Sequence, residues 1–172
     1  MVQSVELLLD APLDTAVRDE WTRLLDAGLH SQGRVRSESN RPHVTLFVAH
    51  ALPDELEDAL RATITVRRIT LRLGGVVIFG GRYATLARTV VPSIELLEFQ
   101  ARVFEVLSEC PGIPAHIRPG EWTPHVTLAR RVPAARIGTA VLAAQTPERQ
   151  LTGSSAGVRR WDGEAKREWL LT

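Results

Sequence analysis

One pentapeptide occurs twice in this chain of 172 residues, and its placement constrains the fold more than any other feature. The two copies of Pro-His-Val-Thr-Leu span residues 42–46 and 124–128, and lie 82 residues apart. Each copy follows a polar loop and opens a run of apolar and β-branched residues that is typical of a strand. The repeat therefore predicts a chain of two halves with the same order of elements.

Apolar spacing and turn residues divide each half into strand, helix, strand, helix, strand and strand. In the first half, the corresponding ranges are 5–9, 14–29, 43–49, 53–63, 66–73 and 76–79. Asp14 is the expected N-cap of the first helix, and Gly74-Gly75 is the expected turn between the last two strands. In the second half, the ranges are 83–91, 92–109, 125–132, 133–144, 151–161 and 168–171.

This order predicts an α+β protein with antiparallel sheets, because helices and hairpins are mixed without a regular series of parallel crossovers. We expect a single bilobal domain over residues 1–172. One lobe is expected at about 1–81 and the other at about 82–172, related by a pseudo-twofold axis around a central cleft. A cleft between two lobes is a common place for a ligand.

The composition excludes several other classes of protein. Apolar residues make up 44% of the chain and charged residues 24%, so a folded core is expected rather than disorder. The net charge of +1 gives no overall positive field for a long duplex, so any nucleic-acid contact is expected to be local. The first residues resemble neither a signal peptide nor a membrane span, so we expect a cytoplasmic protein without membrane contact. A lone cysteine, Cys110, excludes an internal disulfide, and the histidines lack the spacing of a metal site.

Strand geometry brings the polar side chains of each repeat together. Side chains alternate between the two faces of a strand, so His43 and Thr45 share one face, about 6–7 Å apart. His125 and Thr127 share a face in the same way. If the two lobes face each other, these four side chains converge on one point.

Two imidazoles and two hydroxyls suit chemistry on a phosphodiester. One imidazole can remove a proton from the attacking oxygen while the other protonates the leaving oxygen. The ordinary pKa of histidine, about 6.5, keeps both protonation states accessible near neutral pH. The hydroxyls can donate to the non-bridging oxygens, whose negative charge grows in the transition state. This scheme requires neither a metal ion nor another cofactor.

The paired motif His-x-Thr-x, with hydrophobic x, resembles that of the two-histidine (2H) phosphoesterases, and most of all their bacterial 2′-5′ RNA ligase and RNA 2′,3′-cyclic phosphodiesterase group. The similarity in element order and motif position covers nearly the whole chain. The resemblance implies a site between two lobes that opens a 2′,3′-cyclic phosphate to a 2′-phosphate, with 2′-5′ ligation of RNA in some members. It implies that His43 donates a proton to the leaving oxygen, that His125 is the base acting on water, and that Thr45 and Thr127 hold the phosphate. Because the two motifs are alike, the residues alone leave open which histidine is the acid.

Three further residues are candidate substrate contacts. Alternation places Phe47 on the face of His43, where stacking on a base and packing in the core are equally consistent with the sequence. Alternation also places Arg131 on the face of His125, where it would either bind phosphate or remain a solvated charge. Arg41 belongs to an arginine-rich loop that would either capture RNA or simply be solvated.

A different class of function stays open at this stage. A non-catalytic RNA- or nucleotide-binding module could use the same cleft, although binding alone does not need two proton-transfer groups. The expected substrate is an RNA end or a small cyclic nucleotide. We expect a monomer without an obligate protein partner, because the two lobes already complete the site.

Overall fold

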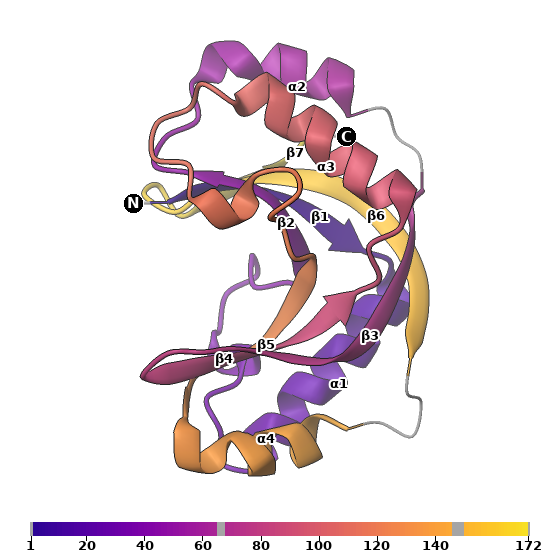
Figure 1. Cartoon of the computed structure of the whole chain (residues 1–172), viewed down its shortest axis with the longest axis vertical. Helices are drawn as coiled ribbons and strands as arrows, with labels where there is room; N and C mark the ends of the chain where they lie inside the picture. The colour runs from indigo at the N-terminus through magenta and orange to yellow at the C-terminus, as the bar shows by residue number, and fades with distance from the viewer. Residues whose placement is uncertain (1, 65–67, 146–149, 172) are drawn as a thin grey trace.

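The computed structural model describes residues 2–64, 68–145 and 150–171, and it consists of two lobes that each combine strands with helices (Figure 1). All strand pairings in these ranges are antiparallel, so the predicted α+β class is confirmed. The strands are β1 (Gln3–Leu9), β2 (His43–Ala49), β3 (Thr70–Phe79), β4 (Tyr83–Val90), β5 (His125–Pro133), β6 (Leu151–Asp162) and β7 (Arg167–Leu170). The helices are α1 (Ala11–Asp26), α2 (Glu57–Thr63), α3 (Ile94–Leu107) and α4 (Ile137–Ala144), with short 3-10 turns at Gln32–Arg34, Asp54–Leu56, Ala115–Ile117 and Ala134–Arg136.

The first helix begins earlier than predicted, because Asp10 rather than Asp14 is its N-cap. The Asp10 carboxylate accepts a hydrogen bond from the backbone N–H of Leu13 at 3.1 Å. The same carboxylate accepts from the backbone N–H of Ser154 on β6 at 2.7 Å, so the cap also ties α1 to a distant strand. Asp14 lies within the first turn and pairs with Arg18 one turn later.

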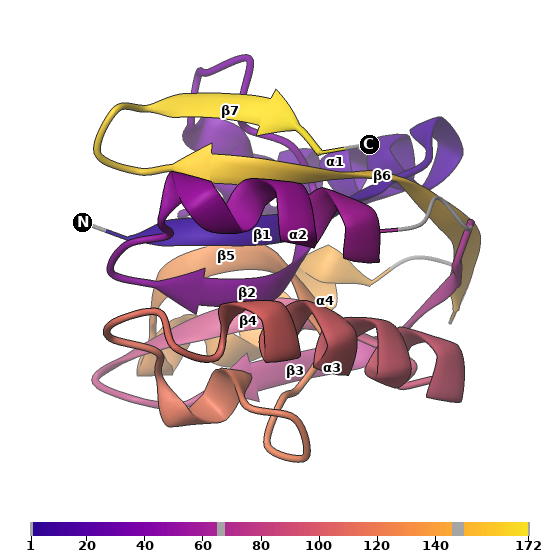
Figure 2. The same ribbon diagram turned by 90° about the horizontal axis from the view of Figure 1, so that it is seen from above.

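The strands form a closed ring in the order β1, β2, β5, β4, β3 and β6, and β7 is added at the side of β6. Figure 2 shows β7, β6, β1 and β2 side by side in one lobe. The two lobes are joined on one side by the pairing of β3 with β6. On the other side, β2 and β5 are joined through one residue pair, Val44 with Val126.

The expected lobes at about 1–81 and 82–172 do not match this arrangement. β1 and β2 share their lobe with β6 and β7 from the end of the chain, whereas β3 pairs with β4 in the other lobe. The helices cross over as well, because α1 packs against α4 and β5, and α3 packs against α2 and β2. The tight turn between β3 and β4 keeps these two strands together, since consecutive strands with a short connection usually pair.

The glycines at 74 and 75 do not form the predicted turn between strands at 66–73 and 76–79. One strand, β3, runs through both glycines, with a register shift at this point; residues 65–67 lie outside the described ranges. A Cβ atom at Gly74 would lie 2.8 Å from the Thr89 hydroxyl, and that hydroxyl donates to the carbonyl of Gly75 at 3.0 Å. The close approach of Thr89 on β4 therefore explains Gly74, whereas a Cβ atom at Gly75 would meet no other atom within 4 Å.

Helices cover the outer side of the sheet in each lobe, as Figure 1 shows, and the core lies between the two layers. Val17 and Leu24 on α1 and Leu96 and Val103 on α3 are fully buried. Among the helices described, none combines the length and the apolar character needed to cross a bilayer.

Candidate active site

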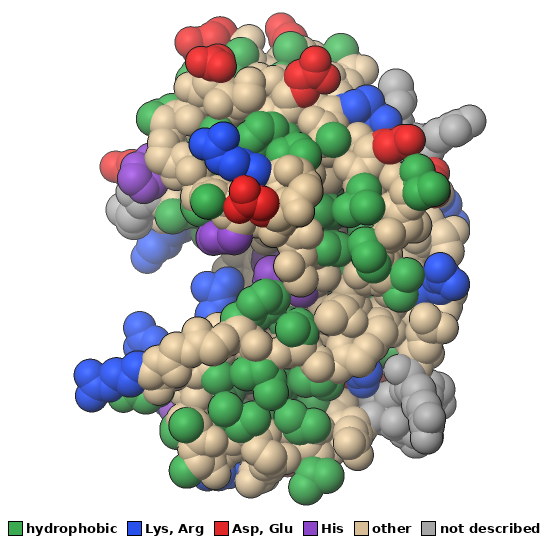
Figure 3. Space-filling view, viewed as in Figure 1, with side chains coloured by type: hydrophobic (Ala, Val, Ile, Leu, Met, Phe, Trp, Pro, Cys, Tyr) green, Lys and Arg blue, Asp and Glu red, His purple; other side chains and the backbone are tan. Residues whose placement is uncertain are grey.

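The central pair of strands places the polar side chains of both motifs on one face. Val44 and Val126 are opposite each other and fully buried, and opposite residues of an antiparallel pair point to the same side. The residues on either side of them therefore point to the other side, and all four are half-buried: His43, Thr45, His125 and Thr127. Counting outward from the valine pair, each histidine of one strand is opposite the threonine of the other. In Figure 3, histidine side chains line the hollow between the two lobes.

Both imidazoles are held in the same way by the residue two positions earlier. Nδ1 of His43 lies 2.7 Å from the carbonyl oxygen of Arg41, and Nδ1 of His125 lies 2.8 Å from that of Thr123. A carbonyl can only accept, so Nδ1 carries the proton in both rings. In the neutral form, Nε2 is then the basic atom of each histidine. Arg41 thus enters the site through its backbone, and its predicted contact with substrate stays a prediction.

The proline before each histidine explains why this carbonyl is available. Pro42 and Pro124 hold the preceding residue in an extended conformation and have no N–H of their own. Both prolines are buried, so the entry into each strand is fixed against the core. The motif is therefore better described as Pro-His-x-Thr, because the proline helps to set the tautomer of the histidine.

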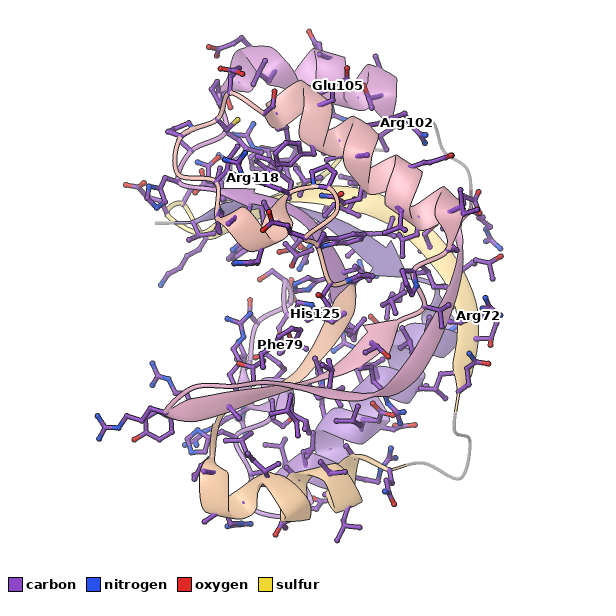
Figure 4. All side chains as sticks on the ribbon, in the orientation of Figure 1. Arg72, Phe79, Arg102, Glu105, Arg118 and His125 are labelled. Carbon is purple, nitrogen blue, oxygen red and sulfur yellow. The ribbon has the colours of Figure 1, made fainter. Side chains whose placement is uncertain are left out.

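The surroundings of His125 favour its neutral form. Burial lowers the pKa of this histidine, and the positive charges of Arg130 and His43 lower it further, against the opposing effect of the Thr123 carbonyl. The ring of Phe79, at the end of β3, lies 4.6 Å from the imidazole ring between centroids, with a tilt of 52°. Figure 4 shows Phe79 and His125 close together at the centre of the molecule.

His43 has a different neighbour, the buried carboxylate of Glu6 on β1. An Oε2 atom of Glu6 lies 3.5 Å from Nδ1 of His43. Ser4 donates to the other oxygen at 2.7 Å, and Arg159 on β6 donates to Oε2 at 2.7 Å. Burial by itself raises the pKa of Glu6, but the charges of His43 and Arg159 and these hydrogen bonds outweigh it and hold the pKa below its ordinary value. Glu6 is therefore an ionised counter-ion for His43 whenever that ring is protonated.

Two tryptophans hold the backbone of the two threonines, and each tryptophan comes from the other half of the sequence than its threonine. The indole N–H of Trp122 donates to the backbone carbonyl of Thr45 at 3.1 Å, and that of Trp21 donates to the carbonyl of Thr127 at 3.0 Å. Within the part of the chain that the structure describes, neither threonine hydroxyl has a hydrogen-bond partner. The backbone of each threonine is thus fixed while its hydroxyl stays available to a ligand.

Phe47 is not available to a substrate, and the core-packing alternative is correct. The pairing of β2 with β1 shifts by one residue after Thr45, which leaves Leu46 as the extra residue of a β-bulge. The carbonyl of Leu46 is held by the buried side chain of Gln100 at 3.2 Å. The bulge reverses the alternation, so Phe47 is fully buried and packs edge-on against Phe104 with 5.9 Å between ring centroids.

Arg131 also departs from strict alternation. The pairing of β5 with β4 shifts twice, and Arg131 has a φ of +57°, which is unusual for a residue other than glycine. Its side chain lines a pocket with His30 and Tyr83 at the end of β5, instead of joining His125 in the cleft. The arginine of this strand whose charge acts on His125 is Arg130.

Sequence reasoning missed the role of Glu6, Phe79, Trp21 and Trp122. One of them left a signal, because Glu6 interrupts the apolar run at 5–9, and a charge in a buried strand indicates a buried partner. The other three reach the site from distant elements, which a single sequence does not relate to the motifs. No group of three or more His, Cys, Asp or Glu side chains in the described ranges is arranged to hold a metal ion.

Comparison with known proteins agrees with this architecture. A solved structure of Escherichia coli LigT complexed with NADP+ is 15% identical with a TM-score of 0.59, covering 98% of this chain and 91% of LigT. Kluyveromyces marxianus Usb1 is 14% identical with a TM-score of 0.55, covering 99% of this chain and 97% of Usb1. No curated protein sequence matches the chain. The profile of the 2′-5′ RNA ligase superfamily matches residues 13–165, which is most of the length. The chain therefore belongs to the 2′-5′ RNA ligase superfamily, the 2H phosphoesterases.

Proposed function

We propose that this protein is a phosphodiesterase that opens 2′,3′-cyclic phosphates of RNA or nucleotides to 2′-phosphates, without a metal ion or other cofactor. The observation that carries the proposal is that His43 and His125 are held by the same hydrogen bond and have the same polar neighbour. Both rings donate Nδ1–H to a backbone carbonyl, and both stand beside a free threonine hydroxyl on one face of two paired strands. An acid, a base and two donors for a phosphate are the groups that this reaction needs.

The two histidines differ in their surroundings, and this difference supports separate roles. His125, whose pKa is lowered chiefly by burial, is neutral near pH 7 and is suited to accept a proton at Nε2. His43 has the Glu6 carboxylate beside its Nδ1 atom, which balances the charge of an imidazolium that carries a proton on Nε2. His125 is therefore assigned as the base and His43 as the acid.

The proposed step conserves atoms and charge. The oxygen of a water molecule forms a bond to phosphorus while Nε2 of His125 takes its proton, and the bond from phosphorus to the 3′ oxygen breaks as Nε2 of His43 protonates that oxygen. Thr45 and Thr127 donate to the non-bridging oxygens as their charge grows. An RNA 5′-hydroxyl in place of water would give a 2′-5′ linkage by the same proton transfers.

The solved relatives support a nucleotide as the ligand. The structures of LigT are complexes with NADP+, 3′-AMP and ATP, and one structure of Usb1 holds uridine monophosphate. These ligands belong to those proteins, and they favour a nucleotide substrate for this chain because the fold is shared.

The test is hydrolysis of adenosine 2′,3′-cyclic phosphate in excess EDTA, with the position of the product phosphate determined by phosphorus NMR. We expect a 2′-phosphate from the wild type and a loss of at least about 100-fold in kcat for His43→Ala and for His125→Ala. His50→Ala is the matched control, because His50 is exposed at the far end of β2 and should leave turnover unchanged. Activity that needs an added divalent metal, or that persists in either histidine variant, would contradict the mechanism. Tight binding of the nucleotide without turnover would favour a binding module.

A further inference from the structure

The register of the strands beside His43 lines up a row of polar side chains across one lobe. Figure 2 shows β2, β1, β6 and β7 side by side in this order. Thr45 on β2 is opposite Glu6 on β1, and Glu6 is opposite Arg159 on β6. Opposite residues of an antiparallel pair point to the same side, so these three side chains share one face of the sheet. Arg159 therefore lies on the face of the candidate site, two strands away from β2.

Arg159 is buried and uses its whole guanidinium group. Only 4% of the residue is exposed. Its Nε atom donates to Oε2 of Glu6 at 2.7 Å, and Nη2 lies 2.7 Å from the same oxygen. Nη1 donates to the backbone carbonyl of Ser39 at 2.7 Å and to the carboxylate of Glu168 on β7. The side chain is therefore fixed in position, because moving it would leave buried donors without an acceptor.

This one guanidinium is connected to both acceptors near Nδ1 of His43. The first acceptor is the carboxylate of Glu6, 3.5 Å from Nδ1. The second is the carbonyl of Arg41 at 2.7 Å, and Arg41 follows Ser39 by two residues in the segment that leads into β2. Arg159 holds Glu6 directly and holds this segment through the Ser39 carbonyl. A single buried cation thus supports two groups that orient the same imidazole.

The charge of Arg159 also determines the charge of Glu6. Burial favours the neutral form of Glu6, and the nearby positive charges of Arg159 and His43 oppose that effect. Without Arg159, the carboxylates of Glu6 and Glu168 would stand near each other with no cation between them, and like charges disfavour ionisation. Glu6 is 5% exposed, whereas the Glu168 side chain is 33% exposed. Glu6 is therefore the carboxyl that would take up a proton.

The charged groups around His43 come from several elements. Glu6 on β1 lies beside it, and the charge of His43 acts on His125 on β5. Arg159 on β6 and Glu168 on β7 stand behind Glu6. Among these groups, Glu6 is the anion beside the ring, so its ionisation controls how well a protonated His43 is balanced.

We infer that Arg159 is a positioning residue for the acid of the proposed reaction: it keeps Glu6 as an anion beside His43 and holds the segment that carries the Arg41 carbonyl. The inference rests on the proposed function, in which His43 protonates the leaving oxygen from Nε2. A neutral Glu6 no longer balances the charge of the imidazolium. Loss of Arg159 should therefore weaken the acid while leaving both histidines in the site.

The next residue of β6 provides a matched control. Arg160 is 3% exposed and forms ion pairs with Asp54 at 3.0 Å and Glu57 at 3.2 Å. Successive side chains of a strand point to opposite faces, so Arg160 lies on the side of α2, where its guanidinium is 4.9 Å from the ring centroid of Trp169. Arg160→Gln removes an equally buried cation without touching Glu6.

The first test needs no turnover and follows the carboxyl carbon of Glu6 by NMR during a pH titration. The signal is identified by its loss in Glu6→Gln. In Arg159→Gln we expect the midpoint of this titration to lie about 1–3 pH units higher than in the wild type, because the cation beside Glu6 is gone. Arg160→Gln should leave it in place, and Arg159→Lys, which keeps the charge, should return it most of the way. If Arg159→Gln does not fold, Arg159→Gln/Glu168→Gln takes its place, with a smaller rise expected because the second carboxylate is removed as well.

The second test measures kcat for adenosine 2′,3′-cyclic phosphate across pH in a double-mutant cycle. Arg159→Gln should lower kcat by about 10-fold at low pH, where Glu6 is protonated, and the loss should shrink as the pH rises through the new midpoint. Glu6→Gln/Arg159→Gln should lose no more than Glu6→Gln alone, because the two residues act through one another. Losses that multiply to about 100-fold, or an equal loss in Arg160→Gln, would overturn the inference.

The two tests separate failure of the inference from failure of the proposed function. A Glu6 titration that does not move in Arg159→Gln overturns the inference, whatever happens to turnover. If the wild type hydrolyses no cyclic phosphate, the proposed function has failed, and the titration alone then decides whether Arg159 keeps Glu6 as an anion.

Discussion

Replacing Arg88 with methionine removes the cation from an ion pair that lies directly behind β5, the strand that begins with His125. Arg88 on β4 is opposite Val126, and only 4% of its surface is exposed. Its Nε and Nη2 atoms donate to the carboxylate of Glu20 on α1 at 2.9 and 2.5 Å, and its Nη1 atom donates to the carbonyl of Gly74 at 3.0 Å. Glu20 is fully buried, so the substitution leaves a buried carboxylate without its cation.

The expected loss is a large share of the stability of the domain. Removing one partner of a buried ion pair costs about 3–5 kcal/mol of the free energy of unfolding, whereas the total for a domain is about 5–15 kcal/mol. Glu20→Gln should cost less than Arg88→Met, because Arg88 keeps the Gly74 carbonyl as an acceptor. The double variant Glu20→Met/Arg88→Met removes both charges of the pair and should be more stable than Arg88→Met. It should stay less stable than the wild type, because Arg23, whose Nε and Nη2 atoms are buried without a hydrogen-bond partner among the described residues, loses the nearby charge of Glu20.

The loss in Arg88→Met should also depend on pH in a defined direction. Burial is the largest influence on the pKa of Glu20 and raises it, and without Arg88 only the weaker effect of the Arg23 charge opposes it. A carboxyl group with a raised pKa stabilises the fold when protonated, and this contribution is lost as the pH rises through its folded-state pKa. Arg88→Met should therefore be less stable at pH 8 than at pH 5.

Urea unfolding followed by circular dichroism measures these differences for the wild type, the single variants and the double variant at both pH values. The ion pair lies on the face away from the cleft, so the turnover of folded molecules should be retained. A loss below about 1 kcal/mol for Arg88→Met, or a double variant less stable than Arg88→Met, would refute the reasoning.

Three further predictions concern the active site. Thr127→Val and Thr45→Val each remove a hydroxyl with little change in shape, and each should lower kcat about 30- to 1000-fold in steady-state assays. The corresponding serine variants keep the hydroxyl and should retain most of the activity. An unchanged kcat in the valine variants would make the hydroxyls structural. Glu6→Gln keeps the shape of the side chain but loses the charge, and should lower kcat by about 10-fold with KM unchanged; an unaltered kcat would remove Glu6 from the mechanism. Because burial lowers the pKa of His125, kcat/KM should hold until the pH falls below about 6.5. Phe79→Ala exposes the ring and should move this loss of activity to higher pH, and a pH profile without that shift would contradict the assignment of His125 as the base.

The sequence was most informative where each motif opens its strand. Alternation placed His43 with Thr45 and His125 with Thr127 correctly, because each pair precedes the bulge in its strand. Beyond those bulges the same rule failed, and it placed Phe47 on the wrong face. A bulge depends on how two strands pair across the sheet, which the local pattern of one strand does not reveal. The catalytic roles of the four side chains stay predictions.

The exchange of elements between the lobes could not be predicted from the order of elements. β1 pairs with β6, which lies about 150 residues later in the chain, and α1 packs on strands of the other half. Periodicity describes each element by itself and contains no information about such distant partners. The duplicated order suggested lobes that are each continuous in sequence, and the pairing of β3 with β4 departs from this.

The single residue pair between β2 and β5 ties the spacing of the two histidines to the packing behind them. Val44 and Val126 lie on the opposite face of the two strands from His43 and His125, and both valines are fully buried. A substitution that changes the volume of either valine should therefore shift one strand against the other at the point where both histidines are attached, so that a change in the core alters the candidate site without touching it.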